Sequence, residues 1–335
     1  MKNKYVFVLV MLVSILVAGL GLTTLYVTET ETTHDDGKFQ IVTSFYPMYI
    51  ATCNVVGENP DVELTNLSEP QTGCLHDFQL TPADMQLLSQ ADVFIINGGG
   101  VESFMEDVAD AYPDLTIINA SEHLELLDED SDHSHSHEEA EHEHGDADHE
   151  DANHEDADHA HHDHGDVNAH AWMSVELYRG QVQAIAQGLC KADPTHEAEY
   201  LQNADTYDTK LAEMQDEQQE IAGEIAGTPV VLFHEAYEYV AQDYDLPVAY
   251  VLDLDEERQV SAGEVADVLE EIKAQNVKVI LAEELYGQKM AQTVQSNADV
   301  QVLYLDPLNR GEYDPDSYLN GMEYNLELLR QLIRE

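Results

Sequence analysis

The stretch PTHEAEYLQNADTYDTKLAEMQDEQQEIAGEIA, residues 194–226, decides how we expect this chain to fold. Its proline stands at the first position, and its one glycine, Gly223, comes close to the end. A segment of this composition favours one uninterrupted helix, which would be about 45 Å long at the α-helical rise per residue. We therefore predict a long, rigid helix over 194–226, with a separate folded part on each side of it.

Short apolar runs alternate with helix signals on both sides of this segment. Strands are predicted before it at 40–44, 62–67, 93–97 and 116–119, and after it at 229–233, 248–252, 277–282 and 301–305. Thr81 before Pro82, and Ser261 three residues before Glu264, are typical helix starts. This alternation predicts an α/β protein with two lobes, 38–190 and 227–335, joined by the long helix. A strut of this kind between two lobes predicts a ligand cleft that cannot close far.

The first 30 residues have a different character. Lys2 and Lys4 precede the apolar run YVFVLVMLVSILVAGLGLTTLY at 5–26. A charged start followed by about 20 apolar residues is typical of a membrane anchor or a secretory signal. We interpret 1–30 as an N-terminal membrane anchor, with a cleaved signal peptide as the alternative, and expect the remainder at the cell surface. No cysteine follows the run, so we expect no lipid-anchored N-terminus.

The charge and the cysteines limit the partners and the cross-links. The chain has 68 acidic against 13 basic residues and a formal net charge of -55. Such a surface repels nucleic-acid phosphates and concentrates cations, so nucleic acid is not an expected partner. The cysteines are Cys53, Cys74 and Cys190, an odd number that allows one bridge. Cys53 and Cys190 lie on two predicted helices of the first lobe, and we predict a bridge between them.

Histidine is concentrated in the segment 123–167. Residues 123–166 hold 12 of the 17 histidines, many carboxylates and no lysine or arginine, and 146–160 is a near-repeat of five residues. With so few apolar side chains the segment predicts a disordered loop. The mixture predicts weak binding of several metal ions, whereas a solvated acidic linker with incidental histidines is the alternative. The loop histidines that we assign to accessory metal binding are His149, His154, His159, His161, His162 and His164.

Other candidate metal ligands stand where predicted strands end. His234 follows 229–233, Glu283 follows 277–282, and Asp306 follows 301–305. His76 lies in the loop after the second strand, and His170 closes the histidine-rich loop. Ligands of open α/β sheets bind beyond the carboxyl ends of the strands, so these side chains predict one tight metal site. Taken singly, each could equally be a helix cap or a structural polar residue.

Five segments carry a family resemblance. They are TSFYPMYI (43–50), TGCLHDFQLTPADMQLLSQADVFIINGGGVESF (72–104), NAHAW (168–172), FHEAYEYVAQDYDL (233–246) and YLDPL (304–308). Through them the chain resembles the metal-binding solute-binding proteins of bacterial ABC transporters, in their zinc-uptake branch. The resemblance implies an ion held between two lobes by three histidines and a carboxylate, here His76, His170, His234 and Asp306. Glu283 is the alternative fourth ligand.

The resemblance has further implications and two departures. It implies an ABC transporter permease as partner and a histidine-rich loop just before the second ligand, and we expect a monomer. Ala169 stands where the family usually has proline, and the cysteine that often anchors family members to lipid is missing.

The ligand chemistry favours zinc. Three imidazoles and one carboxylate suit Zn²⁺ in tetrahedral geometry, whereas Mn²⁺ prefers more oxygen ligands. Copper and nickel also bind imidazole, and the spacing does not separate them from zinc. We therefore predict an extracytoplasmic zinc receptor, not an enzyme, that captures Zn²⁺ and delivers it to a permease. The alternatives are a surface adhesin or zinc-storage protein, and a zinc-dependent hydrolase with Glu283 as its base.

Overall fold

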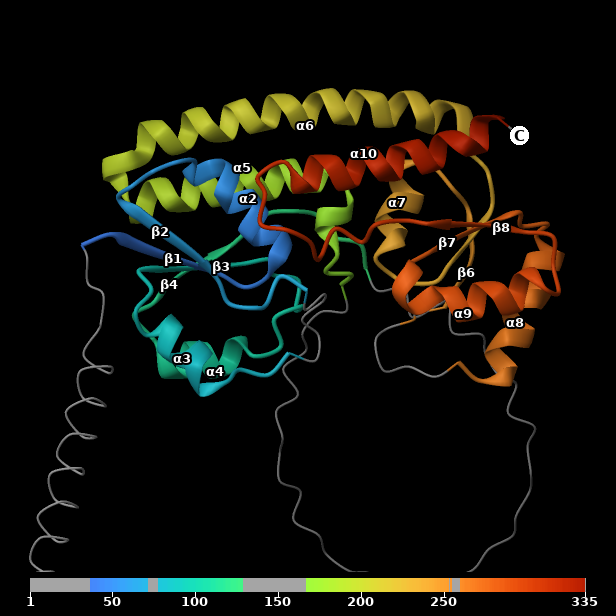
Figure 1. Ribbon diagram of the computed structural model, residues 1–335, viewed down its shortest axis with the longest axis horizontal. Coiled ribbons are helices and arrows are strands. Elements are labelled where there is room, and N and C mark those ends of the chain that lie inside the picture. Colours follow the sequence, from blue (N-terminus) through green and yellow to red (C-terminus); the bar gives the residue numbers. More distant parts are fainter. Residues whose placement is uncertain (1–36, 72–77, 129–166, 253, 255–259, 335) are drawn as a thin grey trace, which may run out of the picture. The chain divides into compact units, whose positions relative to one another are not determined.

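The computed structural model describes residues 37–71, 78–128, 167–252, 254 and 260–334 (Figure 1). Phe39–Glu335 forms one compact unit. The predicted anchor 1–30, the candidate ligand His76 and almost all of the histidine-rich loop lie outside the described residues. Within the described ranges, no helix is long and apolar enough to cross a membrane.

The first lobe is built on a parallel sheet with the strand order β2-β1-β3-β4. The register of β1 runs in step with β2 and with β3, so the carboxyl ends of these strands lie at one edge. The strands are β1 (Phe39–Thr43), β2 (Val62–Asn66), β3 (Val93–Ile96) and β4 (Thr116–Asn119). The helices are α2 (Tyr46–Val56), α3 (Pro82–Leu88), α4 (Met105–Ala111) and α5 (Val175–Ala192), with the short 3-10 turn η2 (Ala171–Met173) before α5.

The second lobe repeats this plan with the parallel order β6-β5-β7-β8. In each sheet the first strand of the lobe, β1 or β5, is an inner strand. The second strand pairs on one side of it, and the third and fourth strands extend the sheet on the other side. The strand order therefore reverses between β1 and β3 and between β5 and β7, which is where open α/β sheets bind ligands. The strands are β5 (Val230–Leu232), β6 (Val248–Val251), β7 (Val279–Ala282) and β8 (Gln301–Tyr304), and the helices are α7 (Tyr237–Asp243), α8 (Ala262–Ala274) and α9 (Glu284–Gln295).

Two long elements connect the lobes. After the 3-10 turn η3 (Pro194–His196), α6 (Glu197–Ile225) packs against α2, α5 and α10 (Figure 1). The chain beyond β8 returns to the first lobe, because α10 (Ser317–Leu329) also contacts α2; the 3-10 turn η4 (Arg330–Arg334) follows it. Where this returning segment meets the first lobe, the Tyr46 hydroxyl donates to the carbonyl of Glu312 at 2.8 Å. The ring centroids of Tyr49 and Tyr313 lie 4.1 Å apart.

Most local predictions are confirmed and one is wrong. Each predicted strand is present with its ends moved by at most two residues, and Thr81 and Ser261 both form capping boxes. The long helix is confirmed, although its first turn is 3-10. The predicted Cys53–Cys190 bridge is wrong, because both thiols are free. Cys53 lines a hollow with Tyr207 of α6, whereas the Cys190 Sγ lies 3.7 Å from the carbonyl of Glu197.

Candidate metal centre

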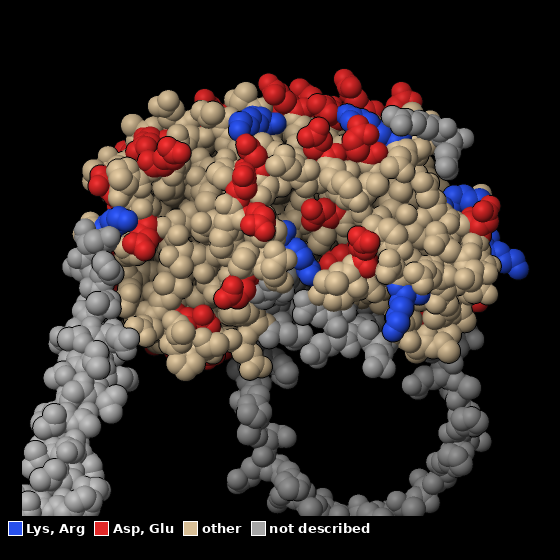
Figure 2. Space-filling view, viewed as in Figure 1, with Lys and Arg blue, Asp and Glu red and all other residues tan. Residues whose placement is uncertain are grey.

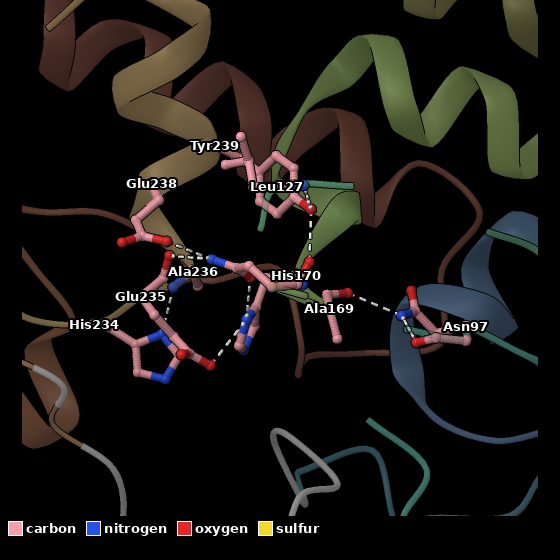
Figure 3. Close-up of polar contacts among 11 residues, drawn as sticks. Asn97, Leu127, Ala169, His170, His234, Glu235, Ala236, Glu238 and Tyr239 are labelled. Carbon is pink, nitrogen blue, oxygen red and sulfur yellow. Dashed lines mark hydrogen bonds and ion pairs between the residues drawn. The ribbon is translucent and has the colours of Figure 1, made fainter. Parts of the chain in front are cut away.

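His170 is completely buried just before η2, in the segment that enters α5. Its backbone N–H and its ring Nδ1 both lie against Asn168 Oδ1, at 3.0 and 2.9 Å. Glu235 Oε1 is 3.4 Å from the same Nδ1. The ring of Trp172 also lies beside it, with 5.0 Å between the ring centroids and the two planes tilted at 54°. This imidazole is therefore fixed on several sides by its neighbours (Figure 3).

His234 follows β5, directly at the point where the strand order of the second sheet reverses. It is 8% exposed, and its Nδ1 accepts a hydrogen bond from the backbone N–H of Ala236 at 3.1 Å. The ring stands edge-on to His170, with the centroids 5.0 Å apart and the planes at 83°. Two imidazoles, one from each lobe, thus lie close together.

The two candidate carboxylates have different partners. Glu283 follows β7 and is 7% exposed, and its Oε1 lies 3.1 Å from the guanidinium of Arg310. Asp306 follows β8, and its Oδ1 accepts from the backbone N–H of Leu308 at 2.8 Å. Burial raises the pKa of Asp306, against the lowering effects of the Leu308 hydrogen bond and of the Arg310 charge. Glu283 is therefore engaged by a cation, whereas Asp306 is held by a neutral amide.

Asp306 is tied to the His170 region through its neighbour Pro307, whose carbonyl accepts from Trp172 Nε1 at 2.9 Å. Asn325 of α10 brackets the Asp306 backbone, accepting from its N–H at 2.7 Å and donating to its carbonyl at 2.8 Å. His76 and the six loop histidines lie outside the described residues. Among the residues that are described, no three His, Cys, Asp or Glu side chains gather closely enough to hold a metal ion. The full ligand set therefore stays a prediction.

Several residues around His170 were missed by the sequence reasoning. Asn168 and Glu235 face its ring, and Tyr239 of α7 holds the backbone beside it by donating to the Asn168 carbonyl at 2.6 Å. One signal for Asn168 was present, because Asn side chains often accept from the backbone N–H two residues later. That bond is formed here, to His170. Glu235 and Tyr239 carry no comparable local signal.

Comparisons with known proteins agree over nearly the whole described chain. The family described as "Zinc-uptake complex component A periplasmic" matches residues 41–332. The high-affinity zinc uptake system protein ZnuA of Bacillus subtilis (strain 168) is 30% identical over 88% of this chain and 87% of its own length. The zinc-binding protein AdcA of Streptococcus pyogenes is 27% identical over 88% of this chain, but the chain spans only 56% of AdcA.

Solved structures show the same fold. The solute-binding protein FpvC of Pseudomonas aeruginosa, in complex with Ni²⁺, matches 89% of this chain and 97% of its own with a TM-score of 0.70 at 22% sequence identity. At this level of identity, the likeness establishes the two-lobed fold with its long connecting helix.

Proposed function

Because the chain belongs to the family of zinc-uptake complex component A proteins, we propose that it is an extracytoplasmic receptor that captures Zn²⁺ and delivers it to an ABC-type permease. The observation that carries this proposal is the pairing of His170 with His234, whose rings lie 5.0 Å apart. They come from two lobes, and His234 stands at the switch point of its sheet. Buried imidazoles that meet there suit a borderline divalent cation.

The proposed ligand set is His76, His170, His234 and Asp306. The ion pair between Glu283 and Arg310 favours Asp306 over Glu283 as the fourth ligand, because a carboxylate that is already neutralised attracts a metal ion less. The same ion pair speaks against the hydrolase alternative, since Glu283 was its candidate base. The lobes are proposed to span 38–190 and 227–335, with 194–226 between them.

The surface charge supports capture of a cation. Figure 2 shows carboxylates spread over the visible face and crowded along the edge formed by α6, where Lys210 is the one lysine of the helix. The negative electrostatic potential of such a surface raises the local concentration of divalent cations. The histidine-rich loop is proposed to bind further ions weakly. The ends that flank it are described, and Asp128 and Val167 form an antiparallel bridge there.

The N-terminal segment 1–30 is proposed to anchor the receptor at the cell surface, or to be a signal that is removed, and the receptor is proposed to act as a monomer. The surface adhesin and the zinc-storage protein remain the alternatives. Both would bind zinc without any dependence on a membrane transporter, so uptake separates them from a receptor.

The test measures zinc binding and zinc uptake with the same variants. His234→Ala removes a proposed ligand, and His196→Gln is the matched control, because His196 is held by Asp193 at the start of α6 outside the ligand set. Calorimetry should show one tight zinc in the wild type and in His196→Gln, and its loss in His234→Ala. In cells that contain the cognate permease, zinc uptake in the presence of a chelator should occur with the wild type and with His196→Gln. It should be lost with His234→Ala. Tight binding that survives His234→Ala, or uptake that is independent of the protein, would refute the proposal.

A further inference from the structure

Asn168 lies where three parts of the molecule meet. It belongs to the neck of the histidine-rich loop, which we define as Leu127, Asp128, Val167 and Asn168. Within this neck the Asn168 N–H donates to the carbonyl of Leu127 at 2.8 Å, next to the Asp128–Val167 bridge. Asn168 is also two residues from the proposed ligand His170, and it contacts the second lobe at the start of α7. Through its backbone and its side chain, this one residue thus connects the loop, the ligand and the opposite lobe.

The amide of Asn168 has only one orientation that satisfies its neighbours. Its Oδ1 faces the backbone N–H of His170 at 3.0 Å, which can only donate. Its Nδ2 faces the carbonyl of Glu235 and the Oε2 of Glu238, both at 2.9 Å, and these oxygens can only accept from an amide. Because Asn168 is 1% exposed, water does not offer an alternative set of partners. The oxygen of the amide must therefore point toward His170.

This orientation determines which ring nitrogen of His170 carries the proton. Asn168 Oδ1 is 2.9 Å from the Nδ1 of His170, and an oxygen with no hydrogen makes Nδ1 the donor. Glu235 Oε1, at 3.4 Å from the same nitrogen, is a second acceptor and acts in the same direction. A neutral ring with its proton on Nδ1 has its lone pair on Nε2. That is the form in which an imidazole binds zinc through Nε2.

We propose that Asn168 is a positioning residue of the metal site, which fixes both the tautomer and the orientation of His170 and is itself held by α7 of the second lobe. The inference rests on the proposed function, in which His170 is a zinc ligand. Partners of this kind in metal sites contribute about 10- to 100-fold in metal affinity. The Nδ1 of His234 differs from that of His170, because it accepts from the backbone N–H of Ala236.

The test uses variants that separate the two ends of the amide. Asn168→Ala removes both, and should lower zinc affinity about 10- to 100-fold. Asn168→Asp keeps an acceptor for His170 but places a carboxylate against Glu238, and should also lower zinc affinity. Glu238→Gln alone should leave zinc affinity unchanged, because the glutamine oxygen still accepts from Asn168. In the double variant Asn168→Asp with Glu238→Gln, the glutamine supplies an N–H donor to the new carboxylate. Part of the lost zinc affinity should therefore be recovered.

Tyr239→Phe is the control for a merely structural effect. The Tyr239 hydroxyl accepts from the Leu127 N–H at 3.1 Å and donates to the Asn168 carbonyl, so its loss loosens the neck without touching the Asn168 side chain. Zinc affinity should then fall much less than in Asn168→Ala, and the tautomer of His170 should not change.

Nitrogen-15 NMR of the histidine rings in the metal-free protein supplies a readout that does not depend on zinc. His170 should be protonated on Nδ1 in the wild type and in Tyr239→Phe, and should lose this preference in Asn168→Ala. A wild-type ring protonated on Nε2, or an Asn168→Ala variant with unchanged tautomer and affinity, overturns the inference. If the wild type binds no zinc tightly, the proposed function fails, while the tautomer measurement still decides the role of Asn168.

Discussion

Glu102 offers a test of how the first lobe holds its side of the site. Its carboxylate is 4% exposed and accepts from the Ser44 hydroxyl at 2.8 Å and from the N–H groups of Asn97 and Gly98 at 2.7 and 3.1 Å. These donors follow β1 and β3, the two strands between which the order of the first sheet reverses. Asn97 continues the network by donating to the carbonyl of Ala169 at 2.9 Å, next to His170. Burial raises the pKa of Glu102 to about 7, although hydrogen bonds from Asn97, Ser44 and Gly98 and one from its own backbone lower it.

The perturbation is Glu102→Gln, and its expected effect depends on pH. The pKa in the folded protein lies above the ordinary value of 4.5, so the folded state favours the protonated carboxyl. Wild-type stability from this group is therefore fully present below about pH 4.5 and is lost as the pH rises toward about 7. A shift of this size corresponds to about 3 kcal/mol in total, of which about 2.5 kcal/mol falls between pH 5 and pH 8. The glutamine cannot ionise and lacks this dependence.

The assay is denaturant unfolding of both proteins between pH 5 and pH 8, with a chelator present to remove metal. Every other titrating group is common to the two proteins, so it cancels in the difference of their unfolding free energies. The glutamine amide also turns an N–H₂ group toward donors, which costs about 1–3 kcal/mol at every pH. Relative to the wild type, the variant should gain about 2.5 kcal/mol from pH 5 to pH 8. A difference that stays constant over this range would show that the Glu102 pKa is not raised.

Three further outcomes follow from the described geometry. Replacing residues 129–166 with two glycines across the Asp128–Val167 bridge should leave one tight zinc and remove the weaker ones; loss of the tightest binding in calorimetry would put the site in the loop. Zinc affinity should fall steeply below about pH 6 as the histidine ligands protonate, and an affinity that is flat from pH 7.5 to 5 would argue against three histidines. Cys190 should react with a thiol reagent before Cys53, whose pKa burial raises to about 11, and equal rates for the two thiols would contradict their described surroundings.

The strands and the helix starts could be predicted from the sequence because their signals lie within a few neighbouring residues. Ser261 and Glu264 form the reciprocal bonds of a capping box within one helical turn, so a pattern of four residues was enough to predict the helix start. The return of α10 to the first lobe was not predicted. An amphipathic helix shows that it buries one face, but its pattern does not say which lobe supplies the partner. The contacts of α10 with α2 and α6 depend on the path of the whole chain.

The site was predictable only in part for a similar reason. Strand-end histidines point to a ligand site, but the reversal of strand order that puts His234 at the switch point is a property of the assembled sheet. Glu102 is separated from its partner Ser44 by 58 residues, and no sequence pattern near Glu102 predicts a buried carboxylate. The Cys53–Cys190 prediction failed because knowing that two helices share a lobe does not fix the directions of their side chains.

His170 and His234, the two described histidines of the proposed ligand set, also differ in which ring nitrogen is available to an ion. His170 donates from Nδ1 to Asn168, so its Nε2 lone pair exists before any metal arrives. His234 accepts at Nδ1 from the Ala236 N–H, so the neutral ring carries its proton on Nε2. If His234 is a ligand through Nε2, as proposed, binding of zinc requires that proton to move to Nδ1 and the bond to Ala236 to break. Because α6 and α10 pack against each other and against α2, we expect this adjustment in the segment after β5 and not as a large movement of one lobe against the other.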